Sequence, residues 1–284
     1  MDPRRAVPSA EPVDAAQAAD TYEDLVADAL AAAEAMSGWD FSYLRNRTSG
    51  GELSWSYPDL AREAISCSTA VLDLDTGGGE LLASLVPLPS YTVATEGWEP
   101  NVLAARERLE PLGVDVRRAQ EGDRLPVADG EFDLVLNRHG AFAVDEVWRA
   151  LSPGGIFLTQ QGGTRNDLEL NAALGAPPSQ DVDTDVFAET LAASVSRGFS
   201  ILTAQEDFAP YAFHDIAAVV FQLTVVSWVL PDFDLRRYDA KLRELDRRLR
   251  DEGPLVVHNH RYLIRAAKPG EGLRPGRCPR LIGR

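Results

Sequence analysis

The chain has 284 residues, 45% of them hydrophobic, which is enough to bury a sizeable core in one large domain or one domain with appendages. Its 44 Asp and Glu residues outnumber its 28 Lys and Arg residues and give a formal net charge of −16 at pH 7. An acidic surface repels RNA and DNA, so we expect no nucleic-acid partner.

Neither the apolar runs nor the cysteines indicate a membrane or secreted protein. Residues 214–230 form the most apolar run, but they are fewer than the ~20 residues of a membrane span and include polar side chains. Residues 1–19 lack the apolar stretch of a secretion signal. Cys67 and Cys278 lie far apart, which favours unpaired thiols and a cytoplasmic location. Nearly all basic residues are arginine, which indicates a bacterial genome rich in G and C.

The first element expected is an N-terminal helix. Residues 1–19 are rich in Pro, Ala and acidic side chains and are predicted to be disordered. From Thr21, a predicted N-cap, apolar residues recur at helical spacing as far as Ala33, and Gly38 is expected to end the helix. A group of aromatic residues follows, made up of Trp39, Phe41, Tyr43, Trp55 and Tyr57.

The next stretch has the pattern of a strand, a tight loop and a helix start. The apolar run Val71–Leu74 leads into Asp75-Thr76-Gly77-Gly78-Gly79, and a helical segment begins at Glu80. Glycines suit a backbone that turns at positive φ or approaches a ligand closely, and the helix start offers free N–H groups. The sequence therefore predicts a cradle for a small molecule.

A second predicted strand, residues 91–95, ends at Glu96, and a helix opens at Glu99. Glu96 follows the glycines at about the distance, ~20 residues, at which doubly wound folds place an acid that binds a ribose diol. Two acids, Asp73 and Glu96, are thus expected at the ends of neighbouring strands.

These residues resemble the Rossmann-like S-adenosylmethionine-dependent methyltransferases. Residues 71–79 match the family's first motif, residues 125–136 its "LPF-x-DG-x-FD" signature and residues 151–157 its "L-x-PGG" entry to strand five. The resemblance is best to small-molecule members of the methyltransferase type 11 group. It implies an α/β fold with a seven-stranded, mostly parallel sheet and helices on both faces, with S-adenosyl-L-methionine as cofactor.

The resemblance also implies which residues hold that cofactor. The glycine-rich loop would seat the methionine part, Glu96 the ribose, and Trp98 and Glu121 the adenine. The full predicted set is Asp73, Asp75, Thr76, Gly77, Glu96, Gly97, Trp98, Gln120, Glu121 and Asn137.

Residues after the predicted fourth strand, 132–136, are expected to face the methyl acceptor. His139 is the predicted general base, although it could instead bond backbone at the strand end. The predicted substrate-binding residues are Tyr43, Trp55, Tyr57, Arg138 and His214. The aromatic residues could equally pack the N-terminal helix onto the domain. His258 and His260 lie two apart without a third ligand nearby, so we expect no metal.

The remaining elements complete a single catalytic domain. We expect a helix over residues 184–195 that stops at Gly198, a short strand over 199–203, an amphipathic helix over 235–249 that packs against the sheet, and a last strand over 255–266. The domain organisation predicted is a disordered start (1–19), a helical and aromatic lid (20–66), a methyltransferase-like domain (67–268) with an inserted helix at about 214–230 over the acceptor side, and a disordered tail (269–284).

One residue departs from the family pattern. Asp75 stands where the first glycine of the loop normally lies, so a side chain and a negative charge are placed near the methionine part of the cofactor. Three functions therefore stay open: methylation of an oxygen or nitrogen atom of a small secondary metabolite, a non-methylating reaction such as cyclisation on the same fold, and cofactor binding without catalysis. The sequence does not identify the methyl acceptor, and it leaves open whether the protein forms a homodimer.

Overall fold

The computed structural model describes residues 20–36, 40–120, 122 and 124–270. Eight strands occur in this part of the chain: β1 (Thr48–Gly50), β2 (Ala70–Leu74), β3 (Tyr91–Glu96), β4 (Asp115–Arg118), β5 (Phe132–Arg138), β6 (Leu151–Gly162), β7 (Ser200–Phe213) and β8 (Leu255–Ala267). The α-helices in the same ranges are α1 (Tyr22–Ala35), α2 (Tyr57–Ser66), α3 (Glu80–Ser84), α4 (Glu99–Leu109), α5 (Val144–Ala150), α6 (Leu168–Ala173), α7 (Val186–Arg197), α8 (Ile216–Val225) and α9 (Leu235–Glu252). Short 3-10 turns are η1 (Ser42–Leu44) and η2 (Glu110–Leu112).

The strands form one sheet in the order β1-β7-β8-β6-β5-β2-β3-β4. The five strands from β6 to β4 are parallel, and β8, β7 and β1 are added antiparallel. The fold class is as expected, but the described chain has eight strands instead of seven. The additional strand is β1, whose three residues, Thr48, Ser49 and Gly50, are too few and too polar to be recognised from the sequence.

The parallel part of the sheet is covered on both faces. Val71 and Leu134 pack in one cluster with residues of α2, whereas Leu72 and Val135 pack in another with residues of α5 and α7. Successive residues of a strand point to opposite faces, so strands buried on both sides read as continuous apolar runs. This explains why β2 and β5 were predictable, and it defines an α2 face and an α5/α7 face of the sheet.

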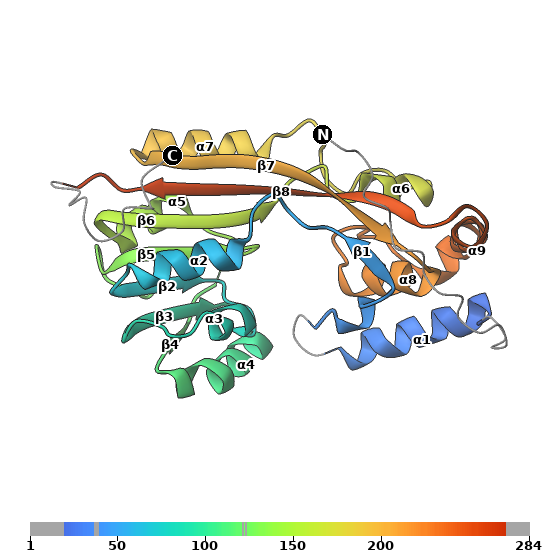
Figure 1. Ribbon diagram of the computed structural model, residues 1–284, viewed down its shortest axis with the longest axis horizontal. Helices are drawn as coiled ribbons and strands as arrows, with labels where there is room; N and C mark the ends of the chain where they lie inside the picture. Colours follow the sequence, from blue (N-terminus) through green and yellow to red (C-terminus); the bar gives the residue numbers. More distant parts are fainter. Residues whose placement is uncertain (1–19, 37–39, 121, 123, 271–284) are drawn as a thin grey trace, which may run out of the picture.

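The strands β7 and β8 run far beyond the parallel part and carry a second group of elements, α1, β1, α8 and α9, at their other end (Figure 1). The expectation of a short strand at 199–203 was wrong, because β7 continues to Phe213 and pairs with β8 along its whole length. The amphipathic helix α9 belongs to this second group, where Leu242 and Leu245 pack in one cluster with α8 residues and with Val257 of β8.

Local signals at helix ends were read correctly. Thr21 caps α1, accepting from Asp24 N while its own N–H donates to the Asp24 carboxylate. Gly198 ends α7 at a φ of 112°. The expectations for residues 1–19, Gly38, Trp39 and 271–284 lie outside the described residues, and the domain boundaries stay a prediction.

Two general expectations have different outcomes. No helix in the described ranges is long and apolar enough to cross a membrane. Cys67, the C-cap residue of α2, is disulfide-bonded, so the expectation of unpaired thiols was wrong. Cysteine usage therefore no longer argues for a cytoplasmic location.

Candidate functional site

The glycine loop, residues 75–79, joins the end of β2 to the start of α3. The Thr76 backbone N–H donates to the Thr95 carbonyl oxygen at 2.9 Å, and the Thr76 hydroxyl donates to Asp73 Oδ2 at 2.6 Å. Gly77 has a φ of 63°, a left-handed conformation that favours glycine. The loop is thus tied to the ends of both β2 and β3.

The buried Glu96 carboxylate holds this arrangement together. Its Oε2 accepts from Gly77 N at 2.8 Å, and its Oε1 accepts from Gly97 N and Trp98 N at 2.9 Å each. The parallel register of β2 and β3 pairs Asp73 with Ala94, so Glu96 lies at the same edge of the sheet as the glycine loop. Two acids end neighbouring strands, as the sequence predicted.

Asp73 is a buried acid with an unusual ionisation. Burial raises its pKa to about 7; the Thr76 hydroxyl bond opposes this shift, and the charge of Asp75 adds to it. A cation placed beside Asp73 and Asp75 would favour the ionised form. The floor of the loop can therefore respond to a positively charged ligand.

Asp75, the residue that departs from the family pattern, keeps the backbone conformation of a glycine, with a φ of 56°. Its Oδ2 accepts from Ala141 N at 3.3 Å. A Cβ placed on Gly140 would lie only 2.4 Å from the Asp75 Cβ. The Asp75 side chain thus takes the room that a side chain at residue 140 would need, and it links the glycine loop to the segment after β5.

A second group of polar residues, the His139 cluster, follows directly and consists of Trp55, Arg138, His139, Gln160 and Arg261. Gln160 Oε1 accepts from the Trp55 indole N–H at 2.7 Å. Because that indole can only donate, the Gln160 amide nitrogen faces His139 Nε2, at 3.1 Å. His139 Nε2 is therefore an acceptor, and the ring is neutral with its proton on Nδ1.

The surroundings of His139 keep it neutral. Although the residue as a whole is exposed, the dense protein around its ring and the charges of Arg261 and Arg138 lower its pKa to about 3. The sequence-based hypothesis assumed an ordinary imidazole. The structure instead gives a weak base whose Nε2 already accepts a hydrogen bond.

The other predicted cofactor residues differ in their access. Trp98 is 62% exposed, and Gln120 is exposed as well. Asn137 is fully buried; its amide donates to the Leu74 carbonyl oxygen and its Oδ1 accepts from Thr159. Asn137 therefore stabilises the strand ends from within. Glu121 lies outside the described residues.

The predicted substrate-binding residues are not brought together. Tyr57, the first residue of α2, is buried, and its hydroxyl donates to the Asn137 carbonyl oxygen. It therefore packs in the core between α2 and the sheet. Tyr43 packs against Phe221 and donates to Asp28, within the second group of elements. His214 also lies there, with Nε2 2.8 Å from Ser49 Oγ. Only Trp55 and Arg138 join His139.

The sequence-based reasoning missed two residues, Gly140 and Arg261. Gly140 follows His139 directly, but its contact with Asp75 is visible only in three dimensions. Arg261 lies two residues before Leu263 in β8. Residues two apart in a strand share a face, so this spacing would have placed both on one face of the sheet.

Each of the two strand histidines lies within hydrogen-bond distance of a glutamate. His258 Nδ1 lies 2.7 Å from Glu169 Oε1, and His260 Nε2 lies 2.6 Å from Glu206 Oε1. Within the described residues, no group of three or more His, Cys, Asp or Glu side chains is placed to hold a metal ion.

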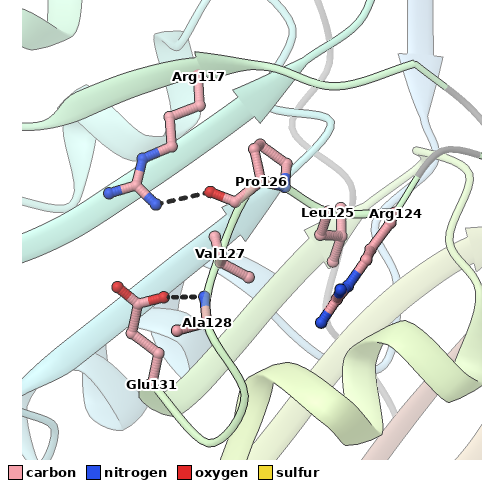
Figure 2. Close-up of a pocket in the computed structure, with 7 residues that line it drawn as sticks. All are labelled: Arg117, Arg124, Leu125, Pro126, Val127, Ala128 and Glu131. Atoms are coloured by element: carbon pink, nitrogen blue, oxygen red, sulfur yellow. Dashed lines mark hydrogen bonds between the residues drawn. The ribbon is translucent and has the colours of Figure 1, made fainter.

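Two surface hollows lie apart from the glycine loop. One, of about 510 Å³, borders edge strand β4 and the turn before β5 and is lined by Arg117, Arg124, Leu125, Pro126, Val127, Ala128 and Glu131. Figure 2 shows that its polar groups bond to one another, Arg117 to the Pro126 carbonyl oxygen and Ala128 N to Glu131. These bonds hold a turn and leave few groups for a ligand. The other, of about 550 Å³, lies beside η1 and β1.

The strand order and the two strand-end acids beside a glycine loop define a Rossmann-like domain with a ligand site at the carboxyl edge of its sheet. Residues 72–159, from β2 into β6, match the family model described as a methyltransferase domain. This matched stretch contains both the glycine loop and Glu96.

Two curated relatives are similar to part of this chain. Protein-L-isoaspartate O-methyltransferase from Cellvibrio japonicus is 38% identical over 107 residues, 35% of this chain and 46% of that protein. An uncharacterised methyltransferase from Synechocystis sp. is 33% identical over 120 residues, 38% of this chain and 54% of that protein. The chain spans about half the length of both relatives.

Among solved structures, a candidate methyltransferase from Bacillus halodurans has a TM-score of 0.53 and 17% identity, covering 74% of this chain and 96% of that chain. At this identity the similarity is one of fold alone.

We expect His139 to stay neutral in the folded protein at all pH values from 8 to 5, because its pKa is about 3. In the urea-unfolded chain it should titrate near the ordinary value of about 6.5. Folding thus favours neutral His139, so its contribution to stability is present above about pH 6.5 and is lost as the pH falls towards 3. NMR titration of the imidazole carbon-bound protons checks this. An inflection near 6.5 for His139 in the folded protein would contradict it.

We expect Gly140→Ala to destabilise the protein by about 1–3 kcal/mol, because its new Cβ would overlap Asp75. In an Asp75→Gly background the same change should cost much less. Urea unfolding of the single and double variants measures the coupling. Gly162→Ala is the matched control, since a Cβ there would meet only Arg261 Nη1, at 3.9 Å. An equal cost of Gly140→Ala in both backgrounds would refute the contact.

Proposed function

We propose that this protein is an S-adenosylmethionine-dependent methyltransferase that methylates an oxygen or nitrogen atom of a small secondary metabolite. The observation that carries the proposal is the junction of the glycine loop with Glu96 at the edge of the sheet, inside the matched methyltransferase domain. When bound, S-adenosylmethionine supplies a methyl group already activated on a sulfonium, so the protein has mainly to position two reactants.

The residues at the strand ends fit this cofactor. Glu96 would hold the ribose and the glycine loop the methionine part, while exposed Trp98 is free to cover the adenine. A Cβ on Gly97 would lie 2.8 Å from the Ala119 carbonyl oxygen, so glycine is needed where β3 and β4 end side by side. Asp75 does not obstruct the loop backbone, because it adopts the conformation of the glycine that it replaces.

The acids Asp73 and Asp75 add selectivity for charge. S-adenosylmethionine carries a sulfonium cation that the product S-adenosylhomocysteine lacks. Carboxylates beside the methyl donor attract the cation, and the product loses this attraction. Asp75 should therefore favour the cofactor over the product.

His139 is the proposed proton acceptor for the methylated atom. Its low pKa makes it too weak a base to deprotonate a neutral hydroxyl group beforehand, so it would take the proton only as methyl transfer makes the acceptor atom strongly acidic. A nucleic-acid acceptor is disfavoured by the net charge of −16. A bacterial origin stays a prediction from the arginine content, and a cytoplasmic location stays a prediction that the cysteines do not support.

Calorimetric titration with S-adenosylmethionine and S-adenosylhomocysteine tests the proposal. We expect both to bind the wild type and Glu96→Gln to weaken both by about tenfold or more, because the ribose loses a charged acceptor. Asp75→Asn should weaken binding of S-adenosylmethionine more than that of S-adenosylhomocysteine.

An exposed acid outside the site provides the matched control, since Glu107→Gln on α4 should leave both affinities unchanged. If the wild type binds neither compound and Asp75→Gly binds both, the fold has been diverted from methyl transfer. If neither protein binds them, the cofactor assignment fails.

A further inference from the structure

Two arginines of the His139 cluster stand out in a protein with an excess of acids. Arg138 ends β5, and Arg261 lies on β8. Among the described residues most arginines form an ion pair, but neither Arg138 nor Arg261 has a carboxylate within salt-bridge distance in the same ranges. Within the described residues, the positive charges of these two guanidinium groups are therefore not neutralised by an ion pair.

Strand register brings the two arginines to one face of the sheet. Arg138 pairs with Gln160 of β6, which pairs with Leu263 of β8, and Arg261 lies two residues from Leu263. Residues opposite each other, and residues two apart, share a face. Arg138, Gln160 and Arg261 therefore all point to the α2 face.

Electrostatic coupling shows that these groups are near one another. Removal from water is the main cause that lowers the pKa of Arg261, and repulsion by Arg138 contributes. Both arginines also lower the pKa of His139. The charge of Asp167 acts against the lowering of the Arg261 pKa, but burial raises the pKa of Asp167 itself to about 6.

There is also room beside the charge. Arg261 donates to the Asn166 side chain and to the His260 carbonyl oxygen, which fixes its guanidinium. Its partner across the ladder is Gly162, where a Cβ would find only Arg261 Nη1 within 4 Å. The glycine leaves space on the face where the guanidinium stands.

We propose that Arg138 and Arg261 bind an anionic group of the methyl acceptor, a carboxylate or a phosphoryl group, and so orient the acceptor beside His139. Guanidinium groups bind such oxyanions by charge-assisted hydrogen bonds. This inference rests on the proposed function for the identity of the ligand as an acceptor, but the anion site itself does not depend on it.

The test compares three probes of the same shape: 4-hydroxybenzoate, 4-hydroxyphenyl phosphate and neutral 4-hydroxybenzamide. Calorimetry should give an affinity for at least one anion about tenfold or more above that for the amide. Arg138→Gln and Arg261→Gln should each remove most of that difference. The tighter of the two anions assigns the group as carboxylate or phosphoryl.

Two further variants keep the result interpretable. Arg247→Gln removes an exposed arginine of α9 and should change no affinity. Gly162→Val fills the space beside Arg261 without removing charge, and it should weaken anion binding even if Arg261→Gln fails to fold. Equal affinities for all three probes, or anion binding that survives both arginine substitutions, would overturn the proposal.

S-adenosylhomocysteine binding is measured on the same samples. Anion binding without it would leave the anion site standing while the proposed function fails. Binding of S-adenosylhomocysteine without anion selectivity would leave the proposed function standing while the anion site fails.

Discussion

The three hydrogen bonds accepted by the Glu96 carboxylate are the constraint on which the site depends. The bond from Gly77 ties the glycine loop to the end of β3, and the bonds from Gly97 and Trp98 hold the turn that follows β3. Both lie at the edge of the sheet where the parallel strands end. A buried carboxylate that accepts several backbone N–H groups is held firmly, and it holds those groups in return. The ligand site is therefore preformed by backbone amides and one acid.

The contact between Asp75 and Gly140 links the glycine loop to the segment that carries His139. Asp75 replaces a glycine of the family pattern, and the complementary glycine appears across the sheet edge, where its missing side chain makes room. His139 stands next to Gly140, and Gln160 holds its ring as a neutral acceptor. The chain thus connects the proposed cofactor loop to the proposed acceptor residues through side-chain packing.

Local chemistry was predictable from sequence, and long-range pairing was not. The apolar runs of β2 and β5, the capping of α1 by Thr21 and the stop at Gly198 depend on neighbours along the chain. Glu96 was predicted because its spacing from the glycines is characteristic of the family. The length of β7 and the place of Arg261 depend on segments that meet only in the folded protein. The aromatic residues lie close together along the sequence, but packing separates Tyr43 from Trp55, and no periodicity encodes that separation.

The most direct test of the account is an amide NMR titration of the protein with S-adenosylhomocysteine. The account predicts that the largest shifts fall on Gly77, Gly97 and Trp98, whose N–H groups bond to Glu96, with little change in α1 and α8. Shifts confined to the hollow beside β4, around Arg117 and Glu131, or no shifts at all, would contradict it.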